Sequence, residues 1–244
     1  MPEHSGRAAR GSSAGAPAEL DPAREVPLSS RWLLACGVVA GPLFTLGYIV
    51  AGITRADYSP WRHPVSSLAL GPNGWIQSAS FVVAGLLLLA FTRGLGRATS
   101  GVTTTPWGAR LMGGAAVILV VAGLFVTDPV SGYPPGSPAR PVALTVRGTV
   151  HAACALLGFV ILVAAMLVFA RAFARRRERG WTVYSLASAL LTTAAFVLTT
   201  QGISQKPGWV AFGGLFERIA FIVGLGWVTA IAWRSFRAVD RSAR

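Results

Sequence analysis

The chain has 244 residues, of which 53% are hydrophobic and only 13% are charged, and its mean hydropathy is positive. That composition excludes an ordinary soluble domain, where about a quarter of the residues are charged, and it indicates an integral membrane protein. The formal net charge of +13 does not indicate a nucleic-acid partner, because the arginines stand in short clusters between apolar runs of bilayer length.

The first segment in chain order, residues 1–27, is rich in Ala, Gly, Pro and Ser and has almost nothing apolar to bury. We therefore expect a disordered cytoplasmic tail. The first apolar run begins only after residue 31 and exceeds the length of a signal-peptide core. It is expected to stay in the membrane.

Six apolar runs follow, each close to the roughly 20 residues that a helix needs to cross a hydrocarbon layer of about 30 Å. The predicted spans are 32–54, 75–92, 111–127, 148–170, 181–202 and about 211–233. The sequence thus predicts an all-α bundle of six transmembrane helices as one domain over residues 28–237. Residues 238–244 are expected to form a basic cytoplasmic tail.

The basic residues that flank these spans predict the orientation, because lysine and arginine near span ends are retained on the cytoplasmic side. Fourteen arginines flank the ends that share a side with both termini, against six basic residues on or near the other side. We expect both termini in the cytoplasm. The preference for arginine over lysine suggests a high-GC bacterial source, and hence the bacterial cytoplasmic (inner) membrane.

Most of the polar chemistry falls on the predicted outer side, in loops 55–74, 128–147 and 203–210 and at the span ends beside them. The candidate binding residues of this outer polar cluster are Asp57, Arg62, His63, Ser66, Asp128, His151, Glu217 and Arg218. Glu217 and Arg218 lie inside the sixth predicted span, where charge is costly and such groups are expected to face the bundle interior. We expect them to pair across helices, with carboxylates for Arg218 and with Arg147 or His151 for Glu217.

Three functions fit this cluster. The sequence favours a non-enzymatic role without a cofactor, in which the cluster binds or passes a small polar solute, a proton or a lipid headgroup, and Arg62 and Arg218 attract an anionic group. A second is that of a structural or accessory membrane protein, in which the cluster is a clamp that only closes the bundle. A third is a metal-dependent lipid hydrolase or transferase, with His63, His151, Asp57 and Asp128 as weak metal-ligand candidates that lack HExxH or CxxC spacing.

Two shorter patterns concern packing. Pro64 and the Gly71-Pro72 step predict a short helix that lies along the outer interface as a lid between the first two spans, with its polar residues facing the outer polar cluster. Gly37 and Gly41 form a GxxxG pair that permits close helix approach. We favour packing within the chain over a homo-oligomer for that pair.

Five stretches resemble a known family in their order. They are "ADYSPWRHPVSSLALGPNGW", "FVTDP", "VRGTVHAACALLGF", "RGWTVYSLAS" and "GLFERIAFIVGLGW". Over roughly residues 30–237 the chain resembles the Domain of Unknown Function 998 family of bacterial multi-span membrane proteins. The resemblance implies the six-span architecture. It places the His63 to Ser66 step, Asp128, His151 and Glu217-Arg218 on the family's recurrent polar positions and implies no catalytic residue.

Overall fold

The computed structural model describes residues 28–97, 105–141 and 143–242, and this part of the chain is helical without a strand. The predicted tail at residues 1–27 lies outside it. The elements in order are α1 (Leu28–Ile53), η2 (Val65–Ala69), α2 (Gly74–Arg97), α3 (Pro106–Leu124), α4 (Val146–Arg175), α5 (Arg179–Ile203), η3 (Val210–Phe212) and α6 (Gly213–Ser242).

The prediction of six spans is confirmed. Each of the six α-helices is long and apolar enough to cross a membrane, so the protein is a multi-pass membrane protein. The helices extend the predicted spans by a few residues at most ends, because the polar flanks continue the helical backbone. The largest extension is in α6, which runs to Ser242, so residues 238–242 continue the last helix.

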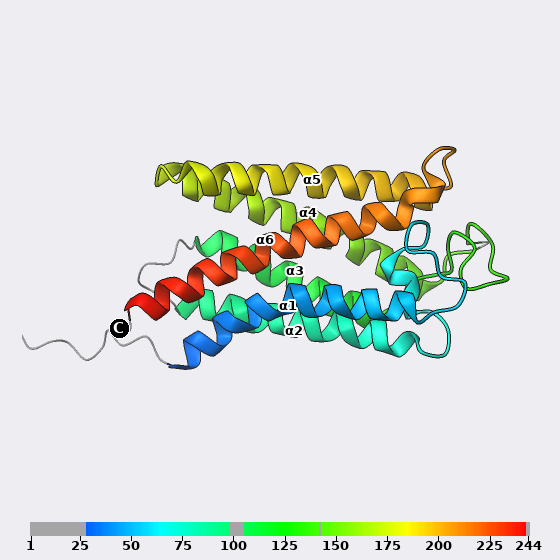
Figure 1. Cartoon of the computed structure of the whole chain (residues 1–244), viewed down its shortest axis with the longest axis horizontal. Coiled ribbons are helices and arrows are strands. Elements are labelled where there is room, and N and C mark those ends of the chain that lie inside the picture. Colours follow the sequence, from blue (N-terminus) through cyan, green and yellow to red (C-terminus); the bar gives the residue numbers. More distant parts are fainter. Residues whose placement is uncertain (1–27, 98–104, 142, 243–244) are drawn as a thin grey trace, which may run out of the picture.

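The six helices form a ring. Each helix packs against its neighbours in the sequence, and α6 closes the ring by packing against α1 as well as α5 (Figure 1). Helices in such a ring bury one face toward a shared axis and leave the other face to lipid. Large apolar side chains accordingly lie exposed on the outside, with Leu190 and Val183 among the most exposed.

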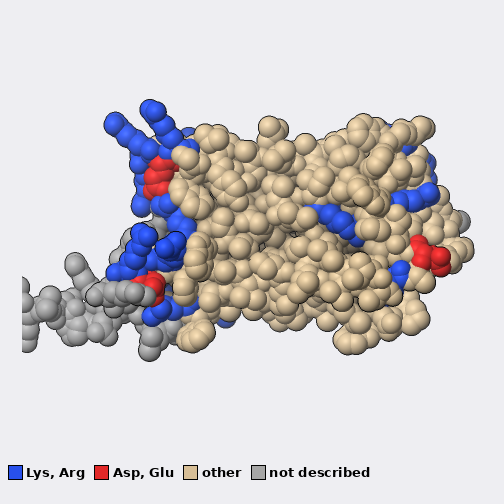
Figure 2. Space-filling view, viewed as in Figure 1, with Lys and Arg blue, Asp and Glu red and all other residues tan. Residues whose placement is uncertain are grey.

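Charge gathers at the end of the ring where α1 begins and α6 ends. Figure 2 shows arginines crowded there. Arg31 on α1 forms an ion pair with Asp240 on α6, and Arg234 on α6 pairs with Glu178 before α5 at 2.6 Å. These two pairs join both neighbours of α6 to it at the charged end.

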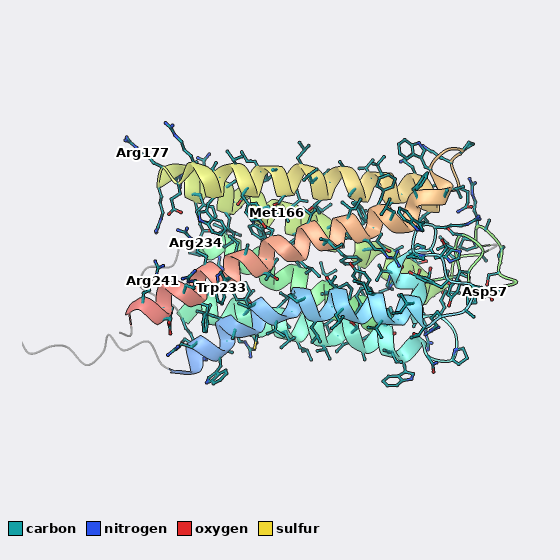
Figure 3. The ribbon with its side chains drawn as sticks, viewed as in Figure 1. Asp57, Met166, Arg177, Trp233, Arg234 and Arg241 are labelled. Carbon is teal, nitrogen blue, oxygen red and sulfur yellow. The ribbon has the colours of Figure 1, made fainter. Side chains whose placement is uncertain are left out.

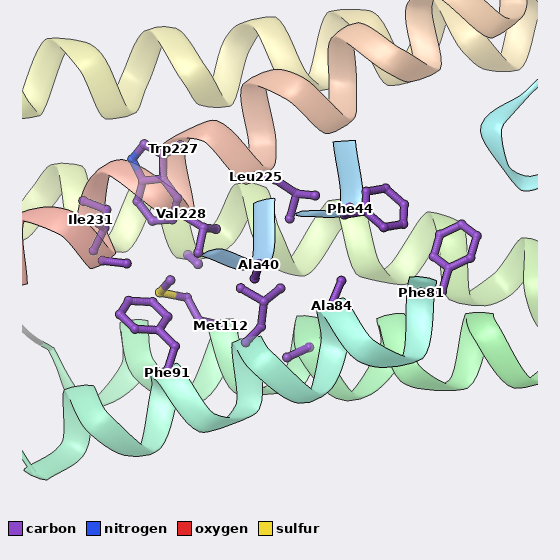
Figure 4. Close-up of a cluster of buried hydrophobic side chains, with 14 of the residues drawn as sticks. Ala40, Phe44, Phe81, Ala84, Phe91, Met112, Leu225, Trp227, Val228 and Ile231 are labelled. Atoms are coloured by element: carbon purple, nitrogen blue, oxygen red, sulfur yellow. The ribbon is translucent and has the colours of Figure 1, made fainter. Parts of the chain in front are cut away.

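Aromatic and aliphatic side chains fill much of the ring's axis. Figure 4 shows Phe44, Phe81, Phe91 and Leu225 pointing inward from three helices. Trp227 on α6 is fully buried, and its indole N–H donates to Ser185 Oγ on α5 at 3.0 Å. A buried indole needs such a partner, so this bond helps to fix the rotation of α6 against α5.

Gly37 and Gly41 pack within the chain. A β-carbon at Gly37 would stand 2.5 Å from Cγ of Phe91 and 2.8 Å from Cβ of Ala232, and one at Gly41 would stand 2.6 Å from Oγ1 of Thr229. The pair therefore lets α1 approach α2 and α6 closely.

These contacts predict the effect of a single methyl group. Gly37→Ala overpacks the interface and is expected to lower the free energy of unfolding by about 1–3 kcal/mol. The matched control is Gly226→Ala on α6, where a β-carbon meets no heavy atom within 4 Å, and it is expected to be neutral or slightly stabilising. Thermal unfolding in detergent measures both. Equal midpoints for the two variants would contradict this packing.

Candidate functional site

Arg218 joins the start of α6 to the loop between α1 and η2. Its Nη1 donates to the carbonyl oxygens of Pro60 at 2.6 Å, His63 at 3.1 Å and Gly214 at 2.9 Å, and its Nη2 donates to the Tyr58 hydroxyl at 2.5 Å. The guanidinium also lies over the Tyr58 ring, 5.5 Å from its centre. The structure thus gives Arg218 backbone partners in place of the carboxylates expected from sequence.

Glu217 faces a different direction and holds η2. Its carboxylate accepts hydrogen bonds from the backbone N–H groups of Val65 and Ser66 at the start of that 3₁₀ helix. Glu217 is only 8% exposed. The predicted short helix is confirmed at Val65–Ala69, but all five of its residues are buried, so it is an inserted plug that closes the end of the ring.

The loop before η2 lies directly on the first turn of α6. The N–H groups of Gly214 and Leu215 donate to the carbonyl oxygens of Arg62 and Trp61 at 3.2 and 2.9 Å. A β-carbon at Gly214 would collide with the carbonyl oxygen of His63. Glycine at this position permits the close approach, and the loop carbonyls reach Arg218 as a result.

His63 is locked by backbone bonds. Its Nδ1 accepts from the Ser59 N–H at 2.9 Å, and the ring packs 5.1 Å from that of Tyr133 in the loop between α3 and α4. The neighbouring Arg62 donates from Nε to the carbonyl of Ser131 in the same loop at 3.0 Å. His63 and Arg62 therefore connect two of the end loops.

Asp128 supports the start of α4. Its carboxylate accepts from the backbone N–H of Thr145 at 3.0 Å and from the Thr145 hydroxyl at 2.7 Å. That hydroxyl accepts in turn from the N–H of Gly148 at 3.0 Å. An acid beside the first N–H groups of a helix is stabilised by the helix dipole. Gly148 has no side chain to collide with the carboxylate.

His151 sits one turn further along α4 and faces inward. Its Nδ1 lies 3.0 Å from the carbonyl oxygen of Ala122 and 2.8 Å from that of Phe125, where α3 ends. Both oxygens can only accept, so Nδ1 must carry the hydrogen in the neutral ring. The other ring nitrogen, Nε2, is then an acceptor.

A narrow apolar cavity of about 80 Å³ runs along the ring's axis between α2, α3, α4 and α6. Ser66, His151 and Glu217 line one end, and nearly all its other walls are apolar. Those walls include Phe81, Leu88, Met112, Ala115, Ile118, Leu119, Ala155, Gly158, Leu162 and Phe221. The cavity therefore brings together three of the eight predicted binding residues.

The other predicted site residues lie outside the cavity lining. Asp57 is exposed on a loop at the tip of the molecule (Figure 3), while Asp128 and His63 are held by the bonds described above. Among the described residues, no three His, Cys, Asp or Glu side chains lie together in a way that could hold a metal ion. The four metal-ligand candidates are thus dispersed over separate environments.

Sequence reasoning missed two components of this end. Tyr58 was not among the predicted site residues, yet its hydroxyl donates to the carbonyl oxygen of Pro64 at 2.9 Å and accepts a hydrogen bond from Nη2 of Arg218. Its position beside Asp57 and Arg62 gave only a weak signal. The cavity walls were missed because each is an ordinary apolar residue of a span, and only the fold shows which of them face an unfilled axis.

The locked state of His63 predicts a pH dependence. Burial lowers the pKa of His63, and Arg62 and Arg218 lower it further. The pKa of His63 in the folded protein is therefore below its unfolded value of about 6.5, and the fold favours the neutral ring. Stability should be full above pH ~6.5 and fall as the pH drops below it. His63→Asn keeps an acceptor for Ser59 and should flatten the dependence of the thermal midpoint between pH 8 and 5. An unchanged slope would contradict this role.

Arg218 predicts a loss of stability on a charge-conserving change. Arg218→Lys keeps the charge but cannot reach three carbonyls and a hydroxyl at once, and is expected to lower the free energy of unfolding by about 2–4 kcal/mol. Arg237→Lys on the same helix is the control, because Arg237 is exposed and lies over Trp233 at 5.6 Å; it should change stability by less than about 0.5 kcal/mol. Denaturant titration in detergent measures both. A mild effect at Arg218 would show that the loop does not depend on it.

The family comparison agrees with the resemblance in the sequence. The family model described as "Protein of unknown function (DUF998)" matches residues 38–234, which include at least part of every α-helix. No curated protein and no solved structure matches the chain. Because the family model covers most of its length, the chain belongs to the DUF998 family of proteins of unknown function.

Proposed function

We propose that this protein binds a lipid-derived amphiphile with a single hydrocarbon chain in the axial cavity. The chain would lie among the apolar walls, and the polar head would meet Ser66, Glu217 and His151. The observation that carries this proposal is the cavity itself, which is apolar along its length and polar at one end.

The length of the cavity supports a chain-like occupant. Its lining runs from Phe81 to Thr92 on α2, from His151 to Leu162 on α4, and from Glu217 to Val228 on α6. Each stretch covers eleven helical steps, or about 16 Å at 1.5 Å per residue. A volume of about 80 Å³ spread over that length is a mean cross-section of only about 5 Å², so a hydrocarbon chain would enter as the wall side chains move apart.

The apolar character of the walls supports hydrocarbon over a polar solute. Ligand sites place a few polar groups where they fix orientation and use apolar walls for the rest of the surface. Among the described residues that line the cavity, the one charged side chain is Glu217 at its end, so the middle of the cavity has no charge of the kind that ion-coupled transport uses. Binding of a polar solute or a proton is therefore a weaker reading of this geometry than binding of an amphiphile.

The arginines of the outer polar cluster serve the loops in this proposal. Arg218 and Arg62 donate to backbone oxygens, and neither lines the cavity. The structural-clamp hypothesis accounts for those two residues and for Asp128. It also accounts for the bonds between His151 Nδ1 and the end of α3, but it leaves the cavity without a role.

We also propose a bacterial cytoplasmic membrane as the location, with both termini in the cytoplasm. The support is the density of arginine at the end of the ring where α6 finishes (Figure 2), together with the positive-inside rule. The polar end of the cavity would then lie toward the outer leaflet.

Narrowing the cavity tests the proposed function. Ala155→Leu on α4 and Ala115→Leu on α3 each add bulk to the cavity wall, and they should reduce the copurifying single-chain lipid seen by native mass spectrometry several-fold. Ala152→Leu is the matched control, because it makes the same change on the exposed face of α4. It should retain lipid like the wild type.

Two results would overturn the proposal. One is equal lipid retention by all three variants, which would place any bound lipid on the outer surface of the ring. The other is wild-type protein that retains no single-chain lipid after purification in a mild detergent and after incubation with a lipid extract.

A further inference from the structure

We infer that the head of the bound amphiphile is neutral and donates hydrogen bonds, so that the ligand class is a long-chain alcohol or a hydroxyl-bearing monoacyl lipid. This inference rests on the proposed function and specifies its ligand. It follows from which atoms the polar end of the cavity offers, and it differs from the anionic group expected from sequence.

His151 supplies the first acceptor. Its Nδ1–H is committed to the carbonyl oxygens of Ala122 and Phe125, so the neutral ring keeps its lone pair on Nε2. Within the described residues, Nε2 has no hydrogen-bond partner, and the residue is 5% exposed and lines the cavity. A donor group of a ligand, or a water molecule, can satisfy this acceptor from the cavity.

Glu217 supplies the second acceptor. Two backbone N–H groups already donate to its carboxylate, but a carboxylate offers about four lone-pair positions. The remaining lone-pair positions belong to a side chain that lines the cavity. A ligand carboxylate or phosphate at this place would set like charges together, whereas a hydroxyl would donate to Glu217.

The cations that could change this preference are directed elsewhere. Arg218 donates to three carbonyls and to Tyr58, and Arg62 donates to Ser131. Neither of them lines the cavity. Among the described residues at this end, Ser66 adds a hydroxyl, which can both donate and accept. The polar end therefore presents at least two acceptors for one flexible hydroxyl.

The charge balance favours a neutral head over an ammonium. Glu217 already receives two N–H donors and lies next to Arg218 in the chain. An added cation would have to leave water for a largely apolar cavity, at a cost of several kcal/mol that a single shared carboxylate does not offset. A hydroxyl enters at far lower cost.

Three probes that share one dodecyl chain test the inference. They are 1-dodecanol, its methyl ether and dodecanoate at pH 9, added to delipidated full-length protein in detergent and measured by native mass spectrometry. The ether carries a methyl group in place of the donor hydrogen of the alcohol. We expect the alcohol to bind at least 10-fold more tightly than either of the other two.

Glu217→Gln assigns the preference to the carboxylate. The amide oxygen can still accept from Val65, but the charged acceptor is lost, so binding of 1-dodecanol should weaken about 10-fold. Binding of the methyl ether, which gives no hydrogen to Glu217, should stay unchanged and so report an intact cavity. If Glu217→Gln loses the binding of both probes, His151→Gln provides the second test. It should weaken the binding of 1-dodecanol and leave the binding of the methyl ether unchanged.

The outcomes separate this inference from the proposed function. If all three probes bind equally and Ala155→Leu weakens them all, the cavity holds chains but does not select a hydroxyl, and the inference fails alone. If dodecanoate binds best, the inference also fails. If no probe binds in a way that Ala155→Leu reduces, the proposed function fails with it.

Discussion

Backbone groups at the edge of an apolar layer must find hydrogen-bond partners within the protein, and in this fold the first turn of α6 provides them. Water cannot serve carbonyl and N–H groups that lie at membrane depth. Arg218 donates to three carbonyl oxygens, and Glu217 accepts from the N–H groups of Val65 and Ser66. Glu217 therefore provides a hydrogen-bond partner for N–H groups of the inserted segment, and Arg218 provides one for its carbonyl groups. The loop between α1 and α2 can enter the ring because of them.

The ring arrangement explains why a cavity exists beneath that loop. Six helices that pack mainly against their ring neighbours leave an axis that side chains must fill. Phe44, Leu225 and Trp227 fill part of it. Alanine and glycine on α3 and α4, such as Ala115 and Gly158, do not reach the axis and leave the passage open. The inserted η2 then closes one end with Ser66. A more bulky set of residues on these two helices would convert the same ring into a solid bundle.

The sequence predicted the architecture well because bilayer length and flanking charge act over each span separately. The spans, the short helix after Pro64 and the packing role of Gly37 needed only local patterns. The hydrogen-bond partners of the buried charged side chains were harder to predict. Arg218 was expected to meet a carboxylate, since a buried charge needs a partner, but three polar groups of a folded loop and the carbonyl of Gly214 on α6 serve as well. The position of the loop depends on the close approach at Gly214. No local pattern encodes that approach. The cavity likewise depends on which apolar residues face one another across the ring.

The adjacent positions of Glu217 and Arg218 make the structural and the binding hypotheses compatible. Neighbouring residues on a helix point about 100° apart, so their side chains face different parts of the structure. Arg218 turns toward the loops and carries the structural role, while Glu217 reaches both η2 and the cavity. A ligand head that donates to Glu217 would thus contact the same carboxylate that fixes the plug. Occupancy of the cavity and the position of η2 are then coupled through one side chain, because both depend on the hydrogen bonds of a single acceptor group.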